Sequence, residues 1–259
     1  MICSQHLWLE KGLKPLLAFE LEPPSLLNYL FRGSRIEARS EDEFLKEAEL
    51  VSRHSDLIRI AEALPEQPYL SSLTSLNILK RSRVGGVKFM CDIRATEMSL
   101  NALIQQVGEA ILQRCDYLVL EGSQEGGRDL GKVIEAYKSL RKLRLTDHIN
   151  VGLEVYVNNR MLIDECVKAE PSFLILRMVD VGEVEEARYR EVAAPNLPIF
   201  IRIPMFDLSG LGLMSTKAIE SIAGEVVKML SQNLNVIVAA PHGFEEAFEV
   251  LKRVRGVFP

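Results

Sequence analysis

Eight short apolar runs recur along the chain, and longer amphipathic stretches separate them. The runs are rich in Val, Ile, Leu or Phe and lie at 16–21, 57–61, 86–91, 116–121, 150–155, 173–178, 198–203 and 235–240. Uninterrupted apolar runs of this length are typical of strands that are buried on both faces, as the strands of parallel sheets are. The chain therefore predicts eight buried parallel strands.

The stretches between these runs carry apolar residues at helical spacing. The clearest examples are residues 99–115, 215–232 and 244–254. Each places its apolar side chains on one stripe, and the second opens with a Ser/Thr pair that is suited to capping a helix. Eight consecutive strand–helix units predict a single parallel (β/α)8 barrel, an α/β fold.

An open, doubly wound sheet is the rival architecture. Such a sheet normally follows its first strand with a Gly-rich turn. Here Pro23 and Pro24 follow the first strand and cannot form that turn. No linker divides the chain, so we expect one domain over 1–259. Residues 1–15 are expected to be an N-terminal extension that covers the amino end of the barrel or a neighbouring subunit.

Composition limits the partners and the compartment. The chain has 259 residues with 31 Lys and Arg against 36 Asp and Glu, a formal charge of −5. A net negative chain is a poor candidate for binding nucleic acid. No apolar run approaches the roughly 20 residues that span a bilayer, and the first residues do not form a signal peptide. The four cysteines lie far apart, which argues against a zinc or disulfide framework and for the reducing cytoplasm.

In barrels of this kind the reactive groups lie at the carboxyl ends of the strands and in the loops that follow. We therefore expect a pocket there, lined by Glu20, Glu62, Arg94, Ser123, Glu154 and Arg177. Further charged residues near strand ends are Asp92, Glu121 and Arg202.

Glu20 lies inside the first apolar run, where a carboxylate is costly to bury unless it is paired or protonated. It is either a functional carboxyl or the partner of Arg177 or Arg202 in an ion pair across the barrel. Acidic groups at this rim would suit Mg²⁺, but arginines compete for them, so we expect no metal site.

Several segments resemble one family in the same order along the chain. AFELEPP (18–24) resembles the SFEFFPP signature of methylenetetrahydrofolate reductases, KFMCDIRAT (88–96) resembles the family's third strand, and DYLVLEGS (116–123) resembles its fourth. Similar matches continue to residue 254. The resemblance implies a flavin-dependent barrel that binds FAD at its mouth. Such an enzyme takes electrons from a pyridine nucleotide and reduces 5,10-methylenetetrahydrofolate, or a related pterin, to the 5-methyl form.

The same resemblance implies roles for individual residues. Glu20 matches the catalytic glutamate, a general acid that donates a proton at N10 of the pterin. This role requires a carboxyl whose pKa burial has raised. The implied cofactor-binding positions are Lys88, Glu121, Gly122, Ser123, Glu154 and Asn158. The implied substrate-binding positions are Glu62, Arg94, Arg177 and Phe206.

The chain departs from the family at its binding motifs. The family's Asp at the flavin, its Thr and its His fall on Ser123, Ala61 and Lys88, and a folate-contacting Gln falls on Arg177. These changes predict weakened or lost FAD binding, or a different pterin carrier. Two other interpretations stay open. One is a repurposed, non-catalytic homologue that acts as a partner subunit in one-carbon metabolism. The other is a barrel lyase or transferase that acts on an anionic substrate through Arg94 and Arg177.

Overall fold

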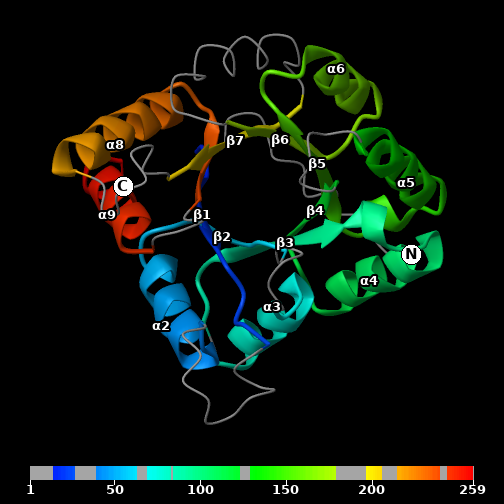
Figure 1. Ribbon diagram of the computed structural model, residues 1–259, viewed down its shortest axis with the longest axis horizontal. Helices are drawn as coiled ribbons and strands as arrows, with labels where there is room; N and C mark the ends of the chain where they lie inside the picture. The colour runs from blue at the N-terminus through cyan, green and yellow to red at the C-terminus, as the bar shows by residue number, and fades with distance from the viewer. Residues whose placement is uncertain are drawn as a thin grey trace.

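Eight parallel strands form a closed barrel in sequence order, as Figure 1 shows. The computed structural model describes residues 14–26, 39–62, 69–82, 84–122, 129–178, 197–205, 215–239 and 244–258. The strands are β1 (Leu17–Leu21), β2 (Leu57–Ile60), β3 (Lys88–Arg94), β4 (Tyr117–Glu121), β5 (Asn150–Tyr156), β6 (Phe173–Arg177), β7 (Ile199–Pro204) and β8 (Asn235–Ala239). Pairing of β1 with β8 closes the barrel. The predicted (β/α)8 fold is confirmed, and a strand overlaps each apolar run.

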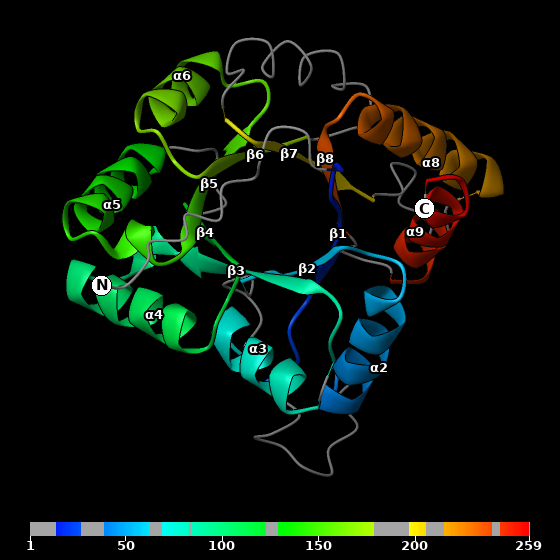
Figure 2. The same ribbon diagram turned by 180° about the vertical axis from the view of Figure 1, so that it is seen from behind.

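The helices form a ring around the barrel (Figures 1 and 2). They are α2 (Glu41–Ser52), α3 (Ser72–Arg81), α4 (Leu100–Leu112), α5 (Leu130–Lys142), α6 (Arg160–Lys168), α8 (Thr216–Ser231) and α9 (Phe244–Val257), with 3-10 turns η1 (Ala95–Glu97) and η2 (Leu145–Asp147). The segment after β6 lies outside the described residues, as do residues 1–13 of the expected extension. Within the described part, no helix combines the length and apolar character that a membrane crossing needs.

Polar side chains define where these helices start. Ser40, Ser71, Ser99, Asn159 and Ser215 are N-caps whose side chains accept a backbone N–H from the first turn. Such caps satisfy N–H groups that have no partner within the helix. They set the points where the chain leaves the loops above the barrel and turns down its side.

A similar device operates at the amino end of the barrel. Side chains at the starts of the even-numbered strands accept a backbone N–H from a neighbouring segment: Asp56 from Leu17 at 2.9 Å, Asp116 from Phe89 at 2.8 Å, Ser172 from Val151 at 3.2 Å and Asn235 from Leu16 at 2.9 Å. These bonds satisfy strand-end donors that the ladder leaves unpaired, and they hold the strands in register.

The amino half of the barrel lumen is packed with apolar side chains. Its residues are Ala18, Leu57, Met90, Tyr117, Val119, Phe173, Ile175, Phe200 and Ile237. The rings of Tyr117, Phe173 and Phe200 meet edge to face, with centroids 5.5 to 6.3 Å apart. This tier is a solid core rather than a pore, as expected for a barrel of eight strands.

Gly152 on β5 makes room for this core, because a Cβ at this position would overlap the ring of Phe173. We expect Gly152→Ala to lower the free energy of unfolding by about 1–3 kcal/mol, the usual cost of overpacking. Urea unfolding measures the change, and Phe173→Leu in the same chain should recover part of it. The matched control is Gly108→Ala in α4, where a Cβ meets nothing within 4 Å. Equal stability of the two alanine variants would contradict this role for Gly152.

Candidate functional site

The carboxyl half of the lumen is filled with charged side chains, which we call the mouth cluster. Its members are Glu20, Arg59, Asp92, Glu121, Glu154, Arg177 and Arg202, from seven consecutive strands. Each lies two residues beyond a residue of the apolar tier or, on β5, beyond Gly152. Because residues i and i+2 share one face of a strand, the apolar core and the mouth cluster are successive layers of one lumen.

Arg59 is fully buried and contacts four carboxyl groups. Its Nε donates to both oxygens of Asp92 at 3.0 Å, and its Nη2 donates to Glu121 Oε1 at 2.8 Å. Nη2 also donates to Glu154, and Nη1 lies 3.2 Å from Glu20 Oε2. A guanidinium removed from water in this way is tolerated only because it is surrounded by opposite charge.

Glu20 is held by two arginines. Arg202 donates through Nε to Glu20 Oε2 at 2.6 Å and through Nη2 to Oε1 at 2.5 Å, a bidentate pair. Burial alone would raise the pKa of Glu20, but the charges of Arg202 and Arg59 outweigh it and lower that pKa to about 2. The expected protonated general acid is therefore wrong at neutral pH. The alternative expectation, an ion pair with Arg202, is confirmed.

Two other carboxyl groups have raised pKa values. Burial raises the pKa of Asp92 to about 7, against the opposing charge of Arg59. Burial and then the charges of Asp92 and Glu154 hold the pKa of Glu121 well above its ordinary range. The four carboxyls of the cluster outnumber its three guanidinium groups, so full ionisation would leave a buried negative charge uncompensated.

Glu154 belongs with the ionised groups. Burial opposes its charge, but Arg59, Arg202 and Arg177 together lower its pKa. Arg177 Nη1 lies 3.9 Å from Glu154 Oε1, and the Arg177 guanidinium lies over the ring of Tyr156 at 5.1 Å. This cation–π contact places Arg177 at the rim of the mouth, where its side chain is partly exposed.

Glu62 and Arg94 lie at the ends of β2 and β3. Glu62 Oε2 accepts the backbone N–H of Ser72, at the start of α3, at 3.3 Å, and burial raises the pKa of Glu62. Arg94 is the register partner of Glu121 across the β3–β4 pair. Both were expected at the mouth, and the structure places both there.

Other expected positions fall elsewhere. Lys88 is the first residue of β3, so it lies at the amino end of the barrel, and its Nζ is 3.5 Å from the Tyr117 hydroxyl. Lys88 lies four residues, roughly 13 Å of strand, before Asp92 of the mouth cluster, so its assignment to a cofactor site at the mouth is wrong. Asn158 is exposed in the turn before α6. Ser123 and Phe206 lie outside the described residues.

The described residues do not bring the expected flavin positions together. Of the expected cofactor positions, Lys88 is at the wrong end of the barrel, and Glu121 and Glu154 are bound by Arg59. Nor does any group of three or more His, Cys, Asp or Glu among the described residues have the arrangement of a metal site.

Arg59, the centre of the mouth cluster, is not among the site residues expected from the sequence. The signal was present, because Arg59 interrupts the apolar run LIRI just as Glu20 interrupts LAFEL. An arginine and a glutamate inside adjacent buried strands should be expected to pair. Asp92 and Arg202 were recognised near strand ends, but no role was expected for Asp92.

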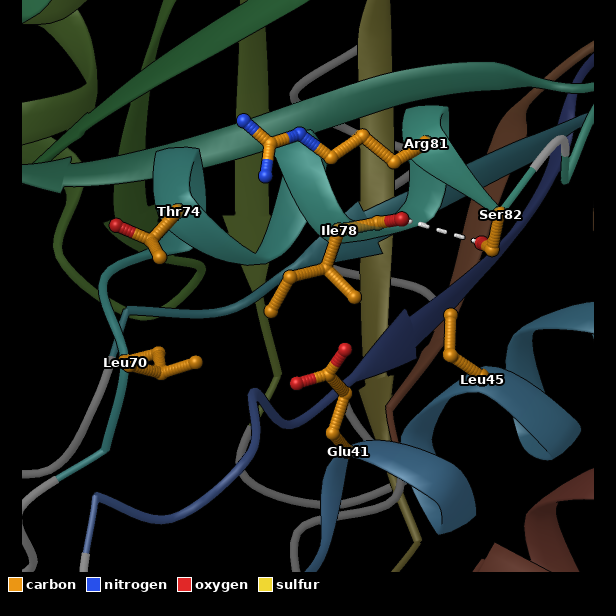
Figure 3. A pocket seen from close by; sticks show the side chains of 7 residues that line it. All are labelled: Glu41, Leu45, Leu70, Thr74, Ile78, Arg81 and Ser82. Carbon is orange, nitrogen blue, oxygen red and sulfur yellow. Dashed lines mark hydrogen bonds between the residues drawn. The ribbon is translucent and has the colours of Figure 1, made fainter. Parts of the chain in front are cut away.

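A pocket of about 470 Å³ lies away from the mouth, in the groove between α2 and α3. Figure 3 shows its lining, in which Ile78 of α3 faces Glu41 and Leu45 of α2. It is part of the outer helical layer and contains none of the mouth cluster. We therefore take the mouth, and not this groove, as the candidate functional site.

Comparison with known proteins finds similarity in fold and not in sequence. No protein-family model matches the chain, and no curated protein matches it in sequence. A chain of the tryptophan synthase complex of Pyrococcus furiosus is 9% identical, with a TM-score of 0.60 over 93% of this chain and 95% of that chain. The tryptophan synthase α chain of Legionella pneumophila is 12% identical, with a TM-score of 0.59 over 94% of this chain and 91% of that one. N-acetylneuraminate lyase of Mycoplasma synoviae is 9% identical, with a TM-score of 0.57 over 91% of this chain and 70% of that one. The protein is a (β/α)8 barrel, and likeness at these identities extends to the fold alone.

Asp92 makes stability depend on pH. The folded chain keeps the Asp92 proton up to about pH 7, whereas the unfolded chain releases it near the ordinary value of 3.8. The contribution of this proton to stability is therefore complete below the pKa of Asp92 in the unfolded chain, and it is lost as pH rises through the pKa of Asp92 in the folded chain. Asp92→Asn cannot titrate at this position. Its melting temperature should therefore rise relative to that of the wild type as pH increases from the ordinary value of 3.8 to about 7. The gain is limited to about 1.4 kcal/mol per pH unit for one proton.

Thermal unfolding of both proteins at several pH values measures this difference. The exposed Asp147→Asn variant is the matched control. A difference between Asp92→Asn and wild type that is flat with pH would show that Asp92 is ionised in the folded protein throughout.

Proposed function

We propose that this barrel is an enzyme of the lyase class that moves a proton on a small anionic substrate bound at its mouth. The observation that carries the proposal is that one cluster holds both an ionised and a neutral carboxyl group. Glu20 is held as a carboxylate, with a pKa of about 2, while Glu121 is held as a neutral acid. Neighbouring titratable groups whose environments push their pKa values apart are the usual mark of an acid–base site.

Glu121 is the proton donor in this proposal. Its side chain is the most exposed of the four carboxyls, at 17%, whereas those of Glu20, Asp92 and Glu154 are 7% exposed or less. A donor must touch the substrate, so the partly exposed group is favoured over the buried ones. Arg59 Nη2 fixes the Glu121 carboxyl from the side of the lumen, at 2.8 Å.

Asp92 acts on Glu121 without touching the substrate. It is fully buried, and its charge is among the causes that raise the pKa of Glu121. It is therefore a positioning residue, which keeps the proton on Glu121 at neutral pH. Glu20 remains a carboxylate, and it holds the guanidinium groups of Arg202 and Arg59 in place.

The arginines provide the complementary charge. When a lyase breaks a bond to carbon, the electron pair stays on one fragment, and that carbanion must be stabilised and then protonated. Arg177 carries a partly exposed positive charge at the rim, which suits stabilisation of a negative charge that develops on the substrate. The neutral carboxyl of Glu121 then supplies the proton and is left as a carboxylate, and in the reverse direction this carboxylate takes the proton back from the same carbon, which is the step that exchange measures. Solved barrels of the same fold that include a lyase and an aldolase support this reaction class.

Solvent deuterium exchange into a panel of small 2-oxo acids and dicarboxylates tests the proposal. We expect the protein to catalyse exchange at the carbon next to the carboxyl or carbonyl group in at least one member of the panel, followed by proton NMR. Glu121→Gln keeps the shape and removes the acid, so the exchange rate should fall by about 10²- to 10⁴-fold.

The control is Glu135→Gln, an exposed change on α5 that should leave the rate unaltered. Exchange that survives Glu121→Gln would overturn the role of Glu121. Absence of exchange over the whole panel would overturn the proposal and favour the non-catalytic partner subunit.

Reduction of a methylene-tetrahydropterin is the second candidate. It rests on the resemblance of AFELEPP and on the position of Glu20, which lies within the mouth cluster, where that family's catalytic glutamate would be. Against it stand the ionised state of Glu20 and the failure of the described residues to bring the expected flavin positions together.

Titration with FAD separates the two candidates. We expect no tight, stoichiometric binding, because the side chains that should hold the flavin are replaced or engaged by Arg59. Loss of one hydrogen bond to a charged group weakens binding by about tenfold to hundredfold. Absorbance and fluorescence of the flavin measure it. Tight binding, followed by reduction of the bound flavin by a pyridine nucleotide, would favour the reductase.

A further inference from the structure

One edge of a buried arginine at the mouth has no partner in the described part of the chain. The Nε and Nη2 atoms of Arg94 are buried and have no hydrogen-bond partner among the described residues. The remaining nitrogen, Nη1, lies 3.3 Å from Glu97 Oε1. The whole side chain is only 8% exposed. Buried donors of a charged group that lack a partner are costly, so this edge is suited to a ligand that arrives from outside.

Arg202 shows what such an edge binds in this same barrel. Its Nε and Nη2 are the two atoms that hold the carboxylate of Glu20, at 2.6 and 2.5 Å. The two N–H groups form a planar fork that matches the two oxygens of a carboxylate. Arg94 presents the same fork, and no described residue supplies its carboxylate.

The position of Arg94 places this fork beside the proposed proton donor. Arg94 lies two residues beyond Asp92 on β3, so both side chains point to the lumen. Arg94 is also the register partner of Glu121 on β4. Glu121 does not fill the fork, because its Oε1 accepts instead from Arg59 Nη2. A ligand on Arg94 would therefore lie next to Glu121.

The surroundings favour a carboxylate over a phosphate. Glu62 and Glu121 both lie close to Arg94, and a phosphate, which can carry two charges on the one group at the fork, would be repelled whenever either is ionised. The N-terminus of α3 lies beside β3, where Ser72 Oγ donates to the Asp92 carbonyl, but its Ser72 N–H already donates to Glu62 and is not free for a phosphate. A carboxylate group brings one charge and two coplanar oxygens to the fork, and a second carboxylate on the same molecule can point away from it, so a carboxylate fits with the least repulsion.

We infer that Arg94 binds the carboxylate of the substrate through its Nε and Nη2 atoms and so places the reacting carbon against Glu121. The inference rests on the proposed function for the identity of the site, and it adds the substrate class: small carboxylic acids. Binding at Arg94 requires no proton transfer, so it can be tested separately.

The test is calorimetric titration of the whole protein with acetate, malonate and inorganic phosphate at constant ionic strength. We expect saturable binding of a carboxylate and weaker binding of phosphate. Arg94→Lys keeps the charge but removes the fork, and should weaken carboxylate binding at least about tenfold. Arg53→Lys, an exposed change next to Glu49 on α2, is the matched control and should bind as the wild type does.

Several results would overturn the inference: no carboxylate binding by the wild type, preference for phosphate, or equal affinity of Arg94→Lys. A measurement on the wild type alone serves if that variant does not fold. The Nε–H resonance of Arg94, assigned by NMR, should shift as malonate is added, and an unchanged resonance would exclude this contact.

Glu121→Gln distinguishes this inference from the proposed function. If the variant loses exchange but still binds malonate, both stand. If exchange is unaffected while malonate binding still depends on Arg94, the proton donor is wrong and the carboxylate site stands. If exchange depends on Glu121 while malonate binds equally well to the wild type and to Arg94→Lys, the acid–base function stands and the inference fails.

Discussion

The contact of Arg59 with four carboxyl groups is the interaction on which the mouth of the barrel depends. A guanidinium with no exposure to water must be matched by opposite charge, and Glu20, Asp92, Glu121 and Glu154 supply it from four different strands. Arg177 and Arg202 add two more positive charges, but three guanidinium groups cannot neutralise four carboxylates, so the four carboxyls are not all readily ionised together. The unequal pKa values of the mouth follow from this shortage of positive charge.

The apolar tier beneath gives the mouth cluster a firm base. Tyr117, Phe173 and Phe200 fill the lumen and exclude water from below, so the charged groups face solvent only at the rim. Burial in this way raises the pKa values of Asp92 and Glu121, and the low local dielectric strengthens the repulsion between carboxylates that raises them further. The chemistry of the mouth therefore depends on packing several residues away along the same strands.

Strand positions could be predicted, but their ends could not. Parallel strands buried on both faces are apolar throughout, so all eight runs were recognisable. The run at 86–91 stopped short, because Asp92 and Arg94 are charged and look like loop residues, whereas β3 continues to Arg94. Lys88 was expected at the site from the family resemblance alone, and the structure places it at the amino end of β3. The mouth cluster itself contains charged residues within strands, which apolar patterning does not find.

The local pattern of residues along the chain decided the eightfold fold, the caps of the helices and the presence of charge inside buried strands, because each depends on neighbours within a few positions. Which charges meet was decided only by closure of the barrel. Glu20 and Arg202 are 182 positions apart along the chain, and the barrel brings them into a bidentate pair. The protonation of each carboxyl depends on the sum of burial and of charges contributed by other strands. For that reason Glu20, an acidic residue in a buried strand, is ionised, while Glu121 at the rim keeps its proton.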